Sequence, residues 1–127
     1  NYKVNKRVIL PAFVECKWSN YYSYNSYRYS AYNDIDKVMC YLSGVSYDTM
    51  TAYPRSTYEK RLNEEEKQRV ALISAVEVVQ VGDNSWHESR FFRFRCFKKG
   101  TLHIEFKDEE LWAKFNKAVN DGVSLGY

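Results

Sequence analysis

The sequence is short of the residues that interrupt regular structure. Its 127 residues include only 5 Gly and 2 Pro, which excludes a collagen-like chain and argues against a scaffold built mostly from loops. Cysteine is also scarce, with 3 residues and no CxxC spacing, so a framework of disulfides would leave one thiol unpaired. We expect Cys16, Cys40 and Cys96 to be buried free thiols of a cytoplasmic protein.

Several functional motifs are absent as well. No uninterrupted apolar run approaches the ~18 residues that span a membrane, and there is no secretory signal peptide. The 2 histidines, His87 and His103, do not combine with the cysteines at any recognised zinc-binding spacing. Glycine-rich phosphate loops and the HExxH and GxSxG motifs are missing. The sequence therefore predicts no membrane contact, no metal site and no cofactor.

Aromatic residues, in contrast, are abundant: 12 Tyr, 7 Phe and 3 Trp make up 17% of the chain. Each buried aromatic side chain removes roughly 150–250 Å² from water, so a domain of this size can build a sound core. We predict a single domain over residues 1–127. Because the chain begins Asn1-Tyr2 without a methionine, we expect it to be a fragment of a longer protein.

The net charge of +3 is small, but the basic residues are unevenly distributed. Residues 1–32 carry five basic and one acidic side chain, and residues 86–107 carry six basic and two acidic. The segments after each of these are acidic on balance. Two basic blocks would form a patch if the fold brings them together, and otherwise they are scattered surface charge.

The first half of the chain predicts one strand, one loop and one helix. Residues 4–16 contain the run Val8–Leu10 followed by Pro11, which indicates an edge strand or an extended segment because proline cannot donate to a ladder. Residues 19–32 hold six tyrosines among Ser and Asn without an apolar period, which favours a loop. Residues 33–43 have apolar side chains at helical spacing, with Asn33 or Asp34 as the expected N-cap and Gly44 as the C-terminal glycine.

A second helix is predicted over residues 63–75. Asn63 and Glu66 form a capping-box pattern at its start. The β-branched continuation at residues 76–81 is compatible with a longer helix or with a strand. A third helix is predicted over residues 108–120, with Asp108 as N-cap and acidic residues in its first turn.

Residues 90–106 predict a β-hairpin whose register can be derived. With a three-residue loop of Lys98, Lys99 and Gly100, the pairs are Phe92 with Phe106, Phe94 with Ile104 and Cys96 with Leu102, which places all six apolar side chains on one face. A two-residue loop would instead put arginines on the apolar face, and burial decides against it. Gly100 then occupies a left-handed position. The predicted fold class is α+β, an antiparallel sheet packed by helices.

The derived register places four polar side chains together on the other face of the hairpin. Arg95 lies opposite His103 and Arg93 lies opposite Glu105, with Lys98 and Lys99 at the tip. Arginine forks bind phosphate oxygens, so these residues are the candidate anion and nucleic-acid site. His103, Glu105 and Arg93 would also be the catalytic candidates of a metal-independent ribonuclease. A solvated face of alternating charges is the non-functional alternative.

Two aromatic groups could contribute to such a site. The tyrosine-rich segment offers rings that could stack on bases or contact a protein; they are Tyr21, Tyr22, Tyr24, Tyr27 and Tyr29. Trp86 and His87, just before the hairpin, could line a pocket beside His103, although a packed loop is the simpler interpretation.

The segment Phe91–Phe106, FFRFRCFKKGTLHIEF, followed by KDEELWAKFN, resembles a family of uncharacterised domains from bacteria, phages and plasmids. That family has a hairpin of the form F-K-N-G-N-x-H-L-x-F and a following helix with an asparagine. Gly100, His103 and Asn116 match its motif, as do the flanking Phe97 and Phe106. The stretch at residues 33–44 also resembles a helix of the family. Lys99 and Thr101 replace its two asparagines.

The resemblance implies a context and no reaction, because domains of that family are often joined to or encoded with DNA adenine methyltransferases of mobile elements. We therefore expect an accessory binding module that contacts DNA or RNA, in association with another domain or a partner protein. A metal-independent ribonuclease and a protein-interaction domain are the alternatives.

Overall fold

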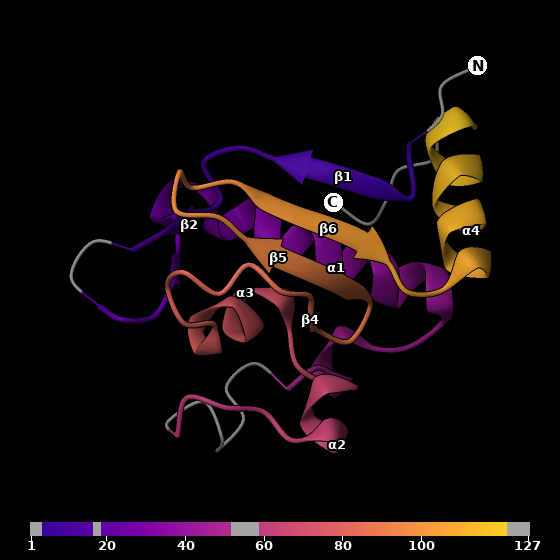
Figure 1. The fold of residues 1–127 in the computed structure, drawn as a ribbon. Coiled ribbons are helices and arrows are strands. Elements are labelled where there is room, and N and C mark those ends of the chain that lie inside the picture. The colour runs from indigo at the N-terminus through magenta and orange to yellow at the C-terminus, as the bar shows by residue number, and fades with distance from the viewer. Residues whose placement is uncertain (1–3, 17–18, 52–58, 122–127) are drawn as a thin grey trace.

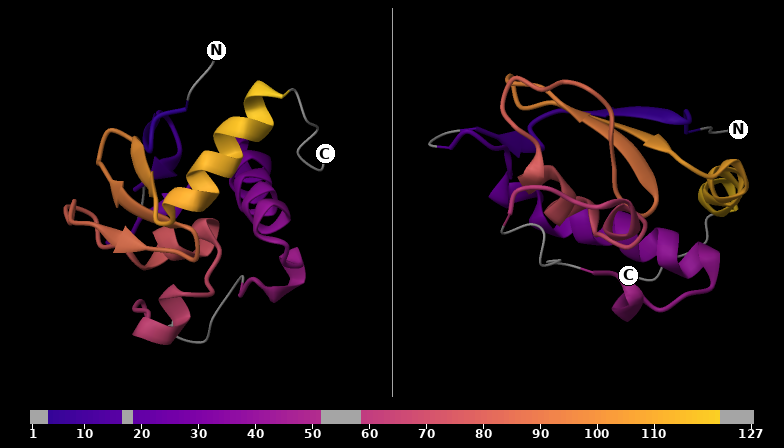
Figure 2. Two further views of the ribbon diagram at one scale, coloured as in Figure 1. Left: turned by 90° about the vertical axis from the view of Figure 1, so that its right-hand side faces the viewer. Right: turned by 60° about the horizontal axis from the view of Figure 1, so that its bottom comes forward.

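The computed structural model describes residues 4–16, 19–51 and 59–121. Its main sheet has four antiparallel strands in the order β1-β6-β5-β4, and a second sheet pairs β2 with β3. Helices α1 and α4 lie on one side of the main sheet, and no helix crosses the side that faces the viewer in Figure 1 (Figures 1 and 2). The fold is therefore α+β as predicted, with one sheet face left open by the described helices.

The hairpin of β5 (Phe92–Cys96) and β6 (Leu102–Phe106) has the predicted register. The Cα partners are Phe92 with Phe106, Phe94 with Ile104 and Cys96 with Leu102, and all six side chains are buried. Gly100 has φ +98°. Strand alternation thus separates an apolar inner face from a polar outer face.

The N-terminal strand is β1 (Arg7–Leu10), which lies at the edge of the sheet next to β6, as the position of Pro11 predicted. The segment just before this strand is held by α4 (Glu109–Asn120), which lies near the other end of the chain. The indole Nε1–H of Trp112 donates to the carbonyl of Val4 at 2.8 Å, and the Asn116 side chain accepts from the Val4 amide at 2.6 Å. The predicted cap of α4 is confirmed, since Asp108 accepts from two amides of the first turn.

Helix α1 (Tyr29–Ser43) ends at Gly44, which has φ +75° as expected, but it begins four residues earlier than predicted. Neither Asn33 nor Asp34 is its N-cap, because Arg28 occupies that position and the short helix η1 (Ser26–Arg28) precedes it. The physical reason is tertiary packing. Tyr32 is fully buried and donates to the carbonyl of Phe13 at 2.7 Å, which the local pattern of tyrosines does not reveal.

The segment over residues 19–32 is accordingly not a plain loop. It forms β3 (Ser23–Tyr24), which pairs with β2 (Val14–Glu15), then η1 and the first turn of α1. Tyr22 is 3% exposed and packs into the core.

The predicted helix over residues 63–75 is split in two. The capping box of Asn63 and Glu66 is present at the start of α2 (Glu64–Lys67), but α2 stops after one turn and α3 covers Leu72–Ala75. Between them Gln68 and Arg69 form a turn, and Val70 then pairs with Thr51. Burial of Val70 and its neighbours outweighs helix propensity here.

The remaining elements are short. The segment at residues 76–81 is neither a longer α-helix nor a full strand, since it forms η4 (Val76–Val78) and then a single bridge from Gln80 to Tyr21. Helix η2 covers Tyr47–Thr49, and β4 (His87–Glu88) closes the sheet beside β5. Cys40 and Cys96 are buried as expected, Cys16 is partly exposed, and all three thiols are free.

The buried carboxyl of Asp36 connects α1 to α3. It is 1% exposed and its Oδ2 accepts from the amide of Leu72 at 2.8 Å. Its Oδ1 has no hydrogen-bond partner among the described residues. Burial raises the pKa of Asp36 from its ordinary 3.8 to about 7, against the opposing effects of the Leu72 amide and the positive charge of Arg90.

This carboxyl makes stability dependent on pH. Because its pKa is higher in the folded state, its contribution is fully present below pH 3.8 and is lost as the pH rises to about 7. Asp36→Asn should remove that loss, so urea denaturation should show the variant gaining stability relative to wild type between pH 4 and 7. Asp36→Ala should cost about 1–3 kcal/mol at pH 4, because the Leu72 amide loses its acceptor, and less at pH 7, where the wild type has lost the contribution of the carboxyl. Parallel pH profiles for wild type and Asp36→Asn would contradict this account.

Gly100 joins the hairpin tip to the turn before β2. Its carbonyl accepts from the amides of Phe13 at 2.9 Å and Val14 at 3.1 Å. A Cβ at Gly100 would lie 3.2 Å from the carbonyl oxygen of Val14, whereas a Cβ at Gly44 would meet nothing within 4 Å.

Gly100→Ala should therefore destabilise the fold more than Gly44→Ala. Both substitutions place a side chain at positive φ, which costs roughly 1–2 kcal/mol. Only the methyl group of Gly100→Ala also comes into close contact with a backbone oxygen, that of Val14. Thermal denaturation of the two variants measures the difference. A larger loss for Gly44→Ala would show that the hairpin tip is not held as described.

Candidate nucleic-acid interface

A row of alternating charges crosses the open face of the sheet. Arg7 of β1, Glu105 of β6 and Arg93 of β5 are Cα partners across three strands. The Glu105 carboxylate accepts from Arg7 at 2.8 Å and from Arg93 at 3.2 Å. This carboxylate therefore fixes two guanidinium groups on one surface while neutralising only one positive charge.

Three arginine side chains on this face contact the ring of Trp86. Its ring centroid lies 5.1 Å from the guanidinium carbon of Arg7, 5.0 Å from that of Arg93 and 5.2 Å from that of Arg95. These distances are within the range of cation–π contacts. Arg95 is also held by a 2.8 Å hydrogen bond from its Nε to the carbonyl of Asn84. The three guanidinium groups and the indole form one ordered cluster.

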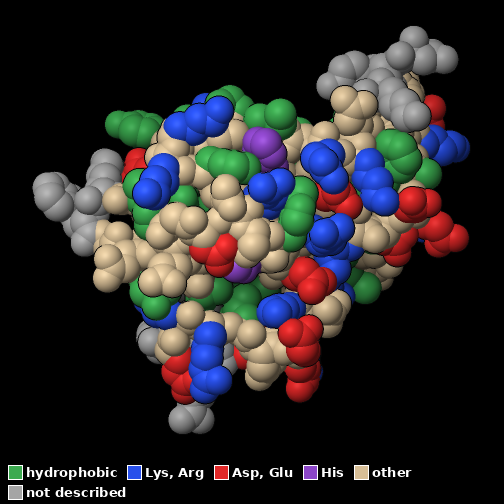
Figure 3. Space-filling model, in the orientation of Figure 1, with side chains coloured by type: hydrophobic (Ala, Val, Ile, Leu, Met, Phe, Trp, Pro, Cys, Tyr) green, Lys and Arg blue, Asp and Glu red, His purple; other side chains and the backbone are tan. Residues whose placement is uncertain are grey.

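A second aromatic pair lies nearer the hairpin tip. The rings of Phe97 and His103 are 4.6 Å apart between centroids, and the guanidinium of Arg95 lies 5.3 Å from the centroid of Phe97. Lys98 and Lys99 follow at the exposed tip. The space-filling view shows Lys and Arg side chains gathered over this face, with carboxylates between some of them (Figure 3).

We call these residues the outer-face cluster: Arg7, Trp86, Arg93, Arg95, Phe97, Lys98, Lys99, His103 and Glu105. It contains five cationic side chains and one carboxylate. Within the described residues, no carboxylate lies in ion-pair distance of Arg95, Lys98 or Lys99. The cluster therefore carries a net positive charge.

The electrostatics of the cluster favour binding over acid–base chemistry. Partial burial, followed by the charges of Arg95 and Lys99, lowers the pKa of His103 below its ordinary 6.5. The hydrogen bond from Arg7, together with the charge of Arg93, lowers the pKa of Glu105. At neutral pH the imidazole is neutral and the carboxylate is ionised. In these forms His103 and Glu105 are suited to accept a proton rather than to donate one as a general acid.

The structure brings together Arg93, Arg95, His103 and Glu105, as the register predicted. The tyrosines of residues 19–32 lie apart from them. Tyr22 is buried, so its ring is not available for stacking. Tyr24 contacts Tyr29 and Tyr32 near the start of α1, and Tyr27 is 94% exposed on η1. No ring contact or hydrogen bond within residues 4–16, 19–51 and 59–121 joins these tyrosines to the cluster.

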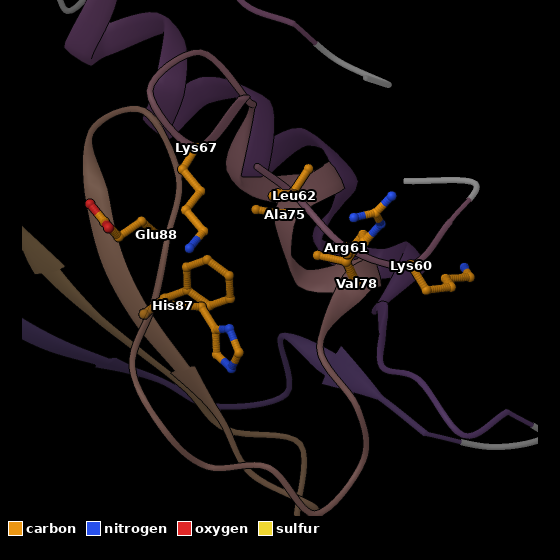
Figure 4. Close-up of a pocket in the computed structure, with 9 residues that line it drawn as sticks. Lys60, Arg61, Leu62, Lys67, Ala75, Val78, His87 and Glu88 are labelled. Atoms are coloured by element: carbon orange, nitrogen blue, oxygen red, sulfur yellow. The ribbon is translucent and has the colours of Figure 1, made fainter. Parts of the chain in front are cut away.

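A pocket of about 230 Å³ is lined by both residues of β4, His87 and Glu88, and by Phe94 of β5. Lys67 and His87 extend into it, and Lys60 and Arg61 lie on the facing segment (Figure 4). Most of these basic groups are already paired with acids: Arg61 with Glu59, Lys67 with Glu64 and His87 with Asp83. The pocket therefore has less excess positive charge than the outer-face cluster.

Three members of the cluster, Arg7, Trp86 and Phe97, are not among the polar residues that the hairpin register placed in the site. Arg7 reaches it because β1 pairs with β6, which is 98 residues away along the chain. Trp86 was expected to be a packed loop residue or a pocket wall, and instead it covers the arginines. The uneven distribution of basic residues was the available signal, because one of the two basic blocks contains Arg7.

The part of the chain that the structure describes contains no cluster of three or more His, Cys, Asp or Glu side chains arranged to hold a metal ion. No described helix is long and apolar enough to cross a membrane.

The fold and the site define a class: a small α+β domain with an open, cationic and aromatic sheet face. The chain belongs to the DUF4942 family, a domain of unknown function whose model matches residues 1–122. The hairpin motif predicted a family of uncharacterised domains, and this match confirms that part of the expectation. No curated protein and no solved structure matched the chain.

Proposed function

We propose that this domain is a binding module that contacts nucleic acid through the outer-face cluster. The observation that supports it most is the convergence of Arg7, Arg93 and Arg95 on Trp86. Guanidinium groups bind phosphate oxygens in bidentate geometry, and here they are held on a rigid sheet. The hairpin resemblance, which implies proximity to DNA adenine methyltransferases, makes DNA the first ligand to test.

Binding of this kind obeys the electrostatics of counterion release. Each phosphate neutralised by a lysine or arginine contributes roughly 0.7–0.9 to the slope of log affinity against log salt concentration. The five cations of the cluster include Lys98 and Lys99 at the exposed tip, where they can reach a strand that passes over the face. The domain should therefore bind more weakly as salt increases.

A metal-independent ribonuclease has less support. Such a mechanism needs a general acid for the leaving oxygen as well as a base, and the lowered pKa values of His103 and Glu105 disfavour the protonated forms that would act as the acid. Interaction with a protein through the tyrosine-rich segment is favoured by one observation, the 94% exposure of Tyr27. If the domain serves only that function, no binding to nucleic acid should be detected.

The double substitution Arg93→Ala/Arg95→Ala should weaken DNA binding by roughly tenfold or more and lower the salt slope by about 1–2, because up to two phosphate contacts are lost. Fluorescence anisotropy with a labelled oligonucleotide between 50 and 200 mM salt measures both. Arg69→Ala is the matched control, because Arg69 is exposed on the turn after α2 and pairs with Glu65. Salt-independent binding, or an equal effect of the control, would refute the proposed interface.

A further inference from the structure

We infer that the ligand of the outer-face cluster is a single strand of nucleic acid, whose bases stack on Trp86 and on the Phe97–His103 pair. This inference rests on the proposed function and adds to it the class of nucleic acid. Three features carry it: the shape of the surface, the spacing of its rings, and the position of its cations between the rings.

The surface has the wrong shape for reading a duplex. Grooves of B-form DNA admit a protruding helix or a two-stranded ribbon, whereas this face is a four-stranded sheet that no described helix crosses (Figures 1 and 2). An open antiparallel sheet with aromatic side chains on it is suited to unpaired bases, which can lie flat against the rings.

The rings and cations alternate along the face. The guanidinium carbon of Arg95 lies 5.2 Å from the Trp86 centroid and 5.3 Å from the Phe97 centroid, so one cation separates two stacking surfaces. A single strand presents bases and phosphates in the same alternation. Ile9, the Cα partner of His103, is 62% exposed and extends the apolar surface toward β1.

The protonation state of His103 fits the same role. Its pKa is lowered, and a neutral imidazole packed on Phe97 is a flat aromatic surface without a charge to solvate. Base–aromatic stacking tolerates any base because every base has a π face. Binding should therefore show little sequence preference and a strong preference for unpaired strands.

The test compares three labelled probes of one sequence by fluorescence anisotropy in the same buffer: a 20-nucleotide DNA strand, the matching duplex, and the RNA strand. Wild type should bind at least one single strand about tenfold or more tightly than the duplex. Trp86→Ala should reduce that affinity by about fivefold or more, and should reduce duplex binding by less, because a duplex loses only the ordering of the arginines. Trp86→Phe, which keeps a ring, should recover much of the loss. Thermal denaturation checks that both variants remain folded.

Quenching of intrinsic fluorescence adds a second readout. The strand should quench wild type more than Trp86→Phe, because the variant lacks the tryptophan of the cluster. Of the other two tryptophans, Trp112 donates to Val4 at the α4 end of the molecule, and Trp18 lies outside the described residues. Duplex binding as tight as single-strand binding, still weakened by Arg93→Ala/Arg95→Ala, would overturn the single-strand inference and leave the proposed function standing. Binding to none of the three probes would overturn both.

Discussion

Side chains alternate between core and solvent along the β5–β6 hairpin, and this alternation determines where the candidate site lies. Because Phe92, Phe94 and Cys96 must face the core, the residues between them must face outward. Burial thus decides where the arginines lie, and Gly100 sets the register by adopting a φ that other residues rarely take. The position of the candidate site is in this sense a consequence of the hydrophobic effect.

The outer-face cluster combines order with excess charge. Glu105 holds Arg7 and Arg93 in place, and Trp86 covers their guanidinium groups. Ordering these side chains before a ligand arrives reduces the conformational entropy lost on binding. The Glu105 carboxylate neutralises one positive charge of the cluster. Lys98 and Lys99 at the tip supply further cations.

The sequence allowed the hairpin, its register, the C-terminal helix and the Gly44 terminus to be predicted, because each depends on neighbours within a few residues. The break between α2 and α3 was not predictable, since Val70 is extended in order to pair with Thr51 and to enter the core. The early start of α1 depends on Tyr32 reaching Phe13. For the same reason the polar residues of the hairpin itself could be derived as part of the site. Arg7 and Trp86 arrive through strand pairing that no local pattern encodes.

The central claim is that the open sheet face, rather than the tyrosine-rich segment, is the contact surface. The most direct measurement is a nitrogen-15 NMR titration with single-stranded DNA that follows the indole and arginine side-chain signals. The account predicts that Trp86, Arg93 and Arg95 shift as DNA is added while the Trp112 indole does not. Shifts confined to residues around Tyr27 and Tyr29, with the Trp86 and arginine signals unmoved, would contradict it.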